Sequence, residues 1–446
     1  MRRKRRLMAI ALKESEELYL KDFREFENRQ SATAPTWLSK LRTEGMQAFA
    51  ELGFPTTRLE DWKYCNVAPI AGMRFQPAAY EPDDSIQERV EEISFTGPEG
   101  TRLVFVNGHY VKELSTVGEL PAGTKVTNLW KAVQQDGTVA ERLGHYANHK
   151  THPFVALNTA FMEDGAFIEV PKDVVVESPI EVLYVSTGGE EPWVAHPRNL
   201  VIAAQGSQLS LVESYVGLGG GVYFNNAVTE IVAEDNAHVD YAKLQSESEA
   251  AFHVATVLAH AGRNAAARTN SIQFGGRLGR EEVTTVLDGE GAEGYLYGLY
   301  VTNGQQLIDN HTTIDHAKPH CSSREFYKGI LDDKSTGVFN GKIMVRKDAQ
   351  KTDSRQSDKN LLLSESATIN TKPQLEIFAD DVKCTHGATV GQIDPESIFY
   401  LRSRGIGLEE ARNLLMVAFA GEIIHRVKVG PFQRQLKAAL LAKMKR

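Results

Sequence analysis

The sequence contains few cysteines. Only Cys65, Cys321 and Cys384 occur in 446 residues, and they are far apart and odd in number. Proteins built on a disulfide framework usually carry an even number of closely spaced cysteines. The cysteine content therefore argues against such a framework and favours a reducing, cytoplasmic location.

The sequence also lacks an excess of basic residues and a long apolar run. Lys and Arg number 50 against 58 Asp and Glu, a formal net charge of -8, whereas binding to a phosphate backbone needs a basic field. No segment reaches the 18 or so apolar residues of a membrane span, and Leu7–Leu12 is too short for a secretory core. We therefore expect no nucleic acid and no membrane as partner. The basic residues 1–6 are interpreted as a disordered tail or an upstream start, with an organelle-targeting peptide as the alternative.

The pattern of residues divides the chain into four regions. Apolar residues recur at helical spacing over residues 14–53, which predicts an N-terminal helical region. A mixed connecting region follows, with one clear strand near Leu103–Asn107. The four expected regions are residues 1–70 (helical, with the basic tail), 71–155 (connecting), 156–393 (strands) and 394–446 (helical).

Short β-prone runs separated by small polar corners fill residues 156–393. The corners recur about every 27–30 residues, which is typical of a coil-by-coil repeat. We therefore predict a mainly β fold with a β-solenoid core; a large antiparallel sandwich is the alternative, but it would show more hairpin turns. The corners are Ala204–Ser207, Ala233–Ala237, Ala261–Ala265 and Asp288–Ala292.

Helical spacing returns after residue 393. Asp394 can cap a helix, Pro395 suits its first position, and Gly405 can end it. The next helix carries an expected apolar stripe formed by Leu408, Ala411, Leu415, Ala418 and Phe419. Such a stripe packs against the parent domain or serves as a docking platform for another protein.

Two glycine-rich segments look like nucleotide-binding loops but lack their chemistry. Gly337–Ile343 has three residues between its glycines instead of four, and Ile343 stands where a phosphate loop has its magnesium-binding Ser or Thr. Gly217–Gly221 lacks the strand, turn and helix of a dinucleotide site. We therefore expect no ATP hydrolysis by this chain.

His311, His316, His320 and Cys321 form the densest cluster of soft ligands. Their spacing matches neither a zinc protease helix nor paired Cys-x-x-Cys arms. Core or corner positions are the expected explanation, with direct metal binding as the alternative.

Cys384 and His386 form a more specific candidate metal site than this cluster. Alternation along a strand would place both side chains on one face, about 7 Å apart. A thiolate and an imidazole together suit iron or zinc, but an iron–sulfur cluster generally takes four protein ligands, so another chain would have to complete it. From spacing alone, a buried structural cysteine beside a corner histidine remains the alternative.

Several motifs between residues 323 and 425 resemble the SufB/SufD family of the SUF iron–sulfur cluster assembly system in order and spacing. These motifs are Ser323–Gly329, Val338–Ile343, Lys351–Asp353, Asn360–Leu363, Thr371–Ile377 and Ala379–Thr389. The SufD branch is favoured over SufB by Lys383–Gly391, Phe399–Gly405 and Glu60–Tyr64.

The resemblance implies a right-handed parallel β-helix with helical regions at both ends. It implies a non-catalytic scaffold that pairs with SufB through the β-helix and binds the SufC ATPase near residues 394–430, with a homodimer as the form expected when SufB is absent. It also implies that His386, and then Cys384, contribute iron or cluster ligands at the SufB interface. Reduced flavin is associated with the family, but no residue signature for it is found.

Two alternatives to a SufD-like scaffold stay open. The first is a SufB-like paralogue, which the Cys-Thr-His-Gly sequence at residues 384–387 disfavours. The second is a β-helix carbohydrate-active enzyme, since such enzymes gather Asp, Lys and Arg on one sheet face, as Lys351–Asp353 and Arg355–Asp358 could.

Overall fold

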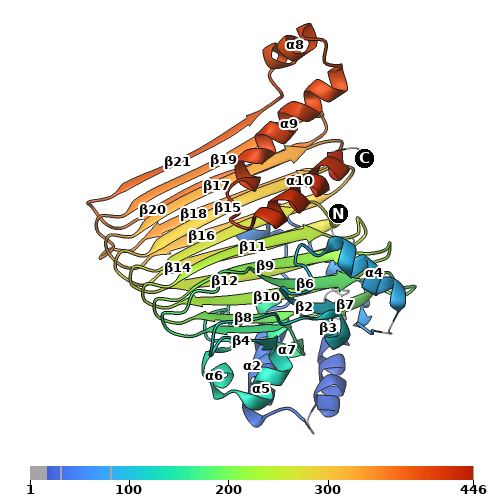
Figure 1. The fold of residues 1–446 in the computed structure, drawn as a ribbon, viewed down its shortest axis with the longest axis vertical. Helices are drawn as coiled ribbons and strands as arrows, with labels where there is room; N and C mark the ends of the chain where they lie inside the picture. The colour runs from blue at the N-terminus through green and yellow to red at the C-terminus, as the bar shows by residue number, and fades with distance from the viewer. Residues whose placement is uncertain (1–17, 31–32, 81–82, 445–446) are drawn as a thin grey trace.

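A computed structural model describes residues 18–30, 33–80 and 83–444, and its main feature is a long β-solenoid (Figure 1). The strands alternate between two sheets as the chain advances from coil to coil. Sheet A contains β4 (Lys125–Asn128), β5 (Ala166–Val170), β8 (Arg198–Ala203), β10 (Tyr223–Ala233), β12 (Phe252–Ala261), β14 (Leu278–Leu287), β16 (Leu307–His316), β18 (Thr336–Val345) and β20 (Thr368–Ile377), with β1 (Gln76–Pro77) and β7 (Trp193–Ala195) at its side. Sheet B contains β3 (His109–Tyr110), β2 (Thr101–Val106), β6 (Ile180–Ser186), β9 (Gln208–Gly217), β11 (His238–Ser246), β13 (Ala266–Gln273), β15 (Glu293–Thr302), β17 (Ser322–Leu331), β19 (Asp353–Leu362) and β21 (Lys383–Gly391).

Successive coils stack in parallel and in register. His238 lies opposite Ala266, and Ala266 lies opposite Glu293 one coil further on. The antiparallel pairs in the two sheets, β2 with β3 and β4 with β5, occur at the first end of the solenoid. The prediction of a mainly β, parallel solenoid is therefore confirmed, and the antiparallel sandwich is wrong.

The four predicted corners are the turns that lead from sheet A to sheet B. Each contains one residue in the left-handed region, where glycine and asparagine are the least strained residue types. The N–H of each such residue donates to a carbonyl in the corner of the next coil, at 2.7–3.2 Å. The same bond recurs in the other turns from sheet A to sheet B, and the residues of this corner ladder are Asp173, Gly206, Asn236, Asn264, Gly291, His320 and Lys351.

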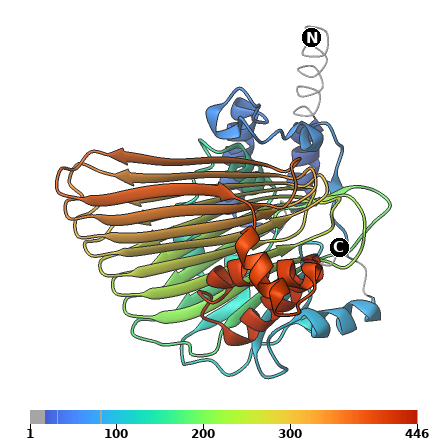
Figure 2. The same cartoon turned by 90° about the horizontal axis from the view of Figure 1, so that it is seen from above.

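The N-terminal region covers the outer face of sheet A (Figure 2). It contains a helix over residues 18–30. Aromatic side chains, including Phe54 and Phe154, pack on the outward-facing Phe224 and Phe252 of β10 and β12. The other elements before the first long strands are α2 (Thr36–Leu52), η1 (Glu60–Trp62), α3 (Ala68–Ala71), α4 (Asp84–Ile93), η2 (Lys112–Leu114), α5 (Leu129–Gln135), α6 (Gly137–Arg142) and α7 (Pro153–Phe161). Helix α4 is the exception to this placement, because it packs on β2 and β6 of sheet B, beside the C-terminal helices.

A fully buried ion pair joins this region to the solenoid. Arg198 Nη2 lies 2.6 Å from Glu230 Oε1, and both side chains are fully shielded from solvent. The Glu230 carboxylate also accepts the backbone N–H groups of Gly144, Tyr146 and Ala147. Glu230 therefore neutralises the charge of Arg198 and accepts hydrogen bonds from the backbone of the turn after α6.

We expect Glu230→Ala to lower the free energy of unfolding by about 3–5 kcal/mol, because it leaves the buried Arg198 without its counter-charge. Glu234→Ala is the matched control, since Glu234 pairs with Arg142 in a partly exposed position and its loss should cost less than about 1 kcal/mol. Chemical denaturation of both variants measures the difference, and similar losses in the two would contradict this role of Glu230.

The C-terminal helices are α8 (Pro395–Ser403), α9 (Leu408–Ile424) and α10 (Gly430–Met444). Asp394 caps α8 by accepting the N–H groups of Glu396 and Ser397, and Gly405 follows the helix with a positive φ, as predicted. Helices α9 and α10 pack on the outer face of sheet B, on the side opposite the N-terminal region (Figure 2). Helix α8 has no buried residue and projects beyond the last coil (Figure 1).

The predicted apolar stripe of α9 is only partly correct. Ala411 is buried, but Leu408 and Ala418 are exposed. The buried face includes Met416 and Ile423 instead, because sheet B contacts the helix along that line. None of the helices in the described ranges is long and apolar enough to cross a membrane.

The two ends of the solenoid differ. At the first end, Tyr110 and Leu120 pack against the interior core, and β3 and β4 border the sheets. At the other end, β20 and β21 are the outermost strands, and no described residue pairs with their free edges. The last coil is therefore open.

Candidate functional site

Cys384 and His386 lie on β21, the free edge strand of sheet B. Cys384 is half-buried and packs against the interior core, so its side chain points into the solenoid. His386 is two residues further along the same strand and faces the same way, as predicted, but it is exposed because no coil covers it. The structure thus brings the two predicted residues together at the rim of the open end.

The Cys384 thiol is held largely in its protonated form. Burial raises its pKa above the ordinary value, and the negative charge of Asp353 adds to the effect. A metal binds the thiolate, so loading this residue requires the release of a proton. Cys65 and Cys321 are buried elsewhere, which leaves Cys384 as the most accessible of the three thiols.

A row of buried polar side chains lies directly below these residues. In β19, Ser354 is opposite Cys384, Gln356 is opposite His386, and Asp358 is opposite Ala388. Gln356 Nε2 donates to Glu325 Oε2 at 2.8 Å, and the Thr312 hydroxyl donates to the other carboxylate oxygen. Burial raises the pKa of Glu325 to about 7 and that of Asp358 to about 6.

Gln356 and Glu325 were not predicted as site residues from the sequence. Polar residues alternate inward along β19, but Arg355 and Lys359 between them are also polar, so the pattern does not reveal which face is internal. The same geometry weakens the carbohydrate-enzyme alternative. Asp358 points inward, away from Arg355 and Lys359 on the outer face, where Asp353 is paired with Arg324.

The histidines near Cys321 lie in separate settings. His311 pairs with Asp309, and His316 is buried beside Ser323, where burial lowers its pKa to about 4. His320 occupies a left-handed corner, and Cys321 is fully buried with its thiol donating to the Gly289 carbonyl. Across residues 18–30, 33–80 and 83–444, no group of three or more His, Cys, Asp or Glu side chains is arranged to hold a metal ion.

The glycine-rich segment Gly337–Ile343 forms part of β18 rather than a phosphate loop. Gly341 faces the interior, where a Cβ atom would overlap Gln356 Nε2 and the Phe339 ring. This glycine therefore provides space for the Gln356 side chain.

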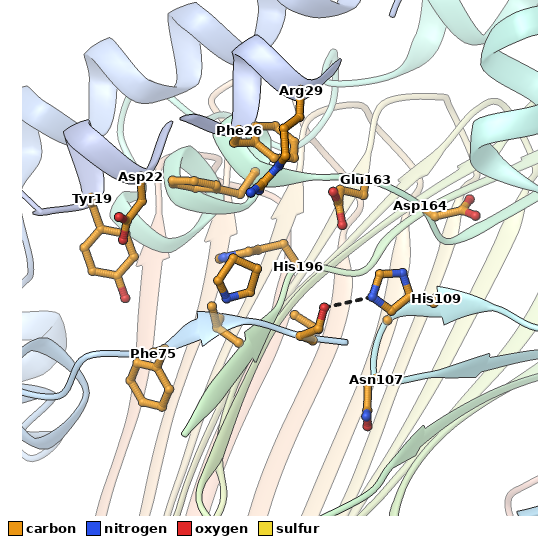
Figure 3. Close-up of a pocket in the computed structure, with 16 residues that line it drawn as sticks. Tyr19, Asp22, Phe26, Arg29, Phe75, Asn107, His109, Glu163, Asp164 and His196 are labelled. Carbon is orange, nitrogen blue, oxygen red and sulfur yellow. Dashed lines mark hydrogen bonds between the residues drawn. The ribbon is translucent and has the colours of Figure 1, made fainter. Parts of the chain in front are cut away.

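A separate cavity lies at the closed end, between the helix over residues 18–30 and β7 (Figure 3). Both histidines that line it already have hydrogen-bond partners. His109 Nε2 bonds the Ala78 carbonyl at 2.9 Å, and His196 Nδ1 lies 3.2 Å from the Asn226 amide. Burial lowers the pKa of His196 to about 3, so the ring is neutral, and it stacks on Phe161. This cavity is distinct from the rim that carries Cys384 and His386.

Comparison with known families covers nearly the whole chain. Residues 184–419 match the model of the SUF system FeS cluster assembly SufBD core domain, and residues 13–182 match that of the SufBD protein N-terminal region. The chain belongs to the SufBD family.

Curated relatives agree with this family assignment. The SufD iron–sulfur cluster assembly protein of Escherichia coli is 34% identical over 89% of this chain and 90% of its own length. An iron–sulfur cluster assembly SufBD family protein of Synechocystis is 34% identical over 91% of both chains, and Bacillus subtilis SufD is 28% identical over 96% and 97%. The resemblance read from the motifs is confirmed, and the SufBD assignment gives the chain a role in iron–sulfur cluster assembly.

The buried Glu325 of this SufBD solenoid predicts a specific dependence of stability on pH. Its pKa lies near 4.5 when unfolded and about 7 when folded, so its favourable contribution is complete below about pH 4.5 and is lost as the pH rises through 7. Glu325→Gln removes this titration. The unfolding free energy of the variant relative to wild type should therefore increase by about 1–3 kcal/mol between pH 4.5 and 8.

Denaturant unfolding at several pH values measures this difference. Glu365→Gln, in an exposed turn, is the control and should follow wild type across the range. A Glu325→Gln curve parallel to wild type would show that the folded carboxyl titrates like an exposed one.

Proposed function

We propose that this chain is a SufD-like scaffold subunit of the SUF system, which supports iron acquisition and cluster assembly without catalysing a reaction by itself. The observation that carries the proposal is the position of Cys384 and His386 on an unpaired edge strand at the open end. A thiol and an imidazole at such a rim can each give one ligand to iron while a second protein supplies the others.

SufB is the proposed partner at the open end. The free edges of β20 and β21 expose backbone N–H and C=O groups that another strand can pair with. Apolar residues beside these edges, Ile377, Phe378 and Val390, are exposed and would be covered by a partner. The same surface would support a homodimer when SufB is absent.

SufC is the proposed partner of residues 394–430. Phe399 and Tyr400 on α8 are 74% and 58% exposed, and Leu414 on α9 is also exposed. Large aromatic side chains at this exposure mark a surface that another protein covers. ATP hydrolysis is assigned to SufC in this proposal.

The remaining parts of the proposal concern the compartment and the cargo. Three free cysteines fit a reducing cytoplasm. The iron or cluster is cargo shared with SufB, and reduced flavin is given no site on this chain.

We expect His386→Ala to reduce iron and cluster content sharply while fold and complex assembly are retained, because an exposed rim side chain contributes little to the core. The change in unfolding free energy should stay within about 0.5 kcal/mol. Iron per complex, thermal unfolding and complex assembly are measured on one preparation of this chain with SufB and SufC.

His238→Ala is the matched control, since His238 is an exposed strand histidine far from the open end. It should load iron normally. Normal iron in a well-folded His386→Ala complex would remove His386 from the proposed site.

We expect Leu414→Asp to abolish SufC binding and to leave SufB pairing intact, because it places a charge on the proposed docking helix α9, whose sheet contacts are mainly with β15 and β17. Leu441→Asp on α10 is a control of similar exposure outside residues 394–430. Pull-down of each variant against the two partners tests this, and loss of both partners together would argue against separate docking surfaces.

A further inference from the structure

Gln356 has an unusual hydrogen-bonding state for a buried amide. Its side chain is 3% exposed and its Nε2 donates to Glu325, yet its Oε1 has no partner among the described residues. An unsatisfied buried acceptor costs about 1–3 kcal/mol, and native proteins keep few of them. The unpaired oxygen therefore points to a donor that completes the site.

The surroundings of Gln356 fix which way the amide faces. Gln356 Nε2 donates to Glu325 Oε2 at 2.8 Å, so the amide NH₂ group faces the carboxylate and the carbonyl oxygen faces away. The Thr312 hydroxyl holds the other oxygen of Glu325, and Gly341 leaves the space in which Gln356 Nε2 lies. The orientation of the amide is thus determined from the coil below.

The residue above Gln356 is His386. The two are direct partners in the parallel ladder between β19 and β21, so their side chains lie on the same face of neighbouring strands about 4.8 Å apart. No hydrogen bond to another described residue fixes the His386 ring. The imidazole N–H is a chemically suitable donor at this position.

We infer that Gln356 positions His386 by accepting one imidazole N–H on its Oε1, which leaves the other ring nitrogen as the metal ligand. Histidines that bind metals commonly donate their second N–H to an oxygen acceptor, which fixes both tautomer and ring orientation. Here the acceptor is a neutral amide backed by the Glu325 carboxylate. The inference rests on the proposed role of His386 as an iron ligand.

The orientation of His386 can be measured without iron in the full-length chain. Selective ¹⁵N-histidine labelling gives signals for 13 histidines, and the signal that His386→Ala removes identifies His386. At about pH 8.5, where an ordinary imidazole is neutral, wild type should show the well-separated nitrogen shifts of one tautomer. In Gln356→Met, which has similar volume but no acceptor, the two shifts should move toward those of a freely exchanging ring, while the corner residue His320 stays unchanged.

A swap variant provides the rescue. Glu325→Gln combined with Gln356→Glu reverses the amide and the carboxylate, so an oxygen again lies below His386 and the single tautomer should return. If Gln356→Met does not fold, as judged by thermal unfolding, Gln356→Ser is used in its place. The serine side chain is too short to contact the His386 ring.

Iron binding in the complex with SufB and SufC separates this inference from the proposed function. Gln356→Met should weaken iron binding by about 10–100-fold, and the swap should restore it. An unchanged His386 tautomer in Gln356→Met overturns the inference, whatever the iron content. A changed tautomer with normal iron in both Gln356→Met and His386→Ala overturns the proposed function and leaves the hydrogen bond itself supported.

Discussion

Parallel pairing between successive coils is the constraint on which the rest of the structure depends. The backbone groups of the stacked strands are satisfied by the coil before and the coil after, as in the ladder from His238 to Ala266 and Glu293. Such a stack gains stability coil by coil, but its last coil has no successor. The exposed edges of β20 and β21, and the exposure of His386 on one of them, follow directly from that arrangement.

Polar side chains inside the solenoid lie in the coils directly below the open end. Buried carboxyl groups such as Glu325 are unfavourable in a core unless hydrogen bonds satisfy them. Thr312 and Gln356 provide those bonds, and together they form a polar support below the rim. A purely aliphatic interior would avoid this desolvation cost, but it would offer no hydrogen-bonding group to a polar side chain on the last coil.

The sequence predicted those features that depend on local backbone chemistry. The corners were recognisable because left-handed positions select residues such as Gly206 and Asn264, and the cap at Asp394 because few residue types can accept two helix N–H groups. Cys384 and His386 were placed on one face because alternation is a property of any strand. The buried side of α9 was mispredicted because it depends on which sheet covers the helix. Gln356 was missed because both faces of β19 are polar.

The difference between the two ends of the solenoid limits the stoichiometry of any assembly formed through them. A repeat protein with two open ends can polymerise head to tail into a filament, since every added copy exposes a fresh edge. Here Tyr110, Leu120 and the antiparallel strands β3 and β4 close the first end. The first end offers an added strand only the two residues of β3 and the four of β4, against ten in β20 and nine in β21, so strand pairing favours extension at the last coil.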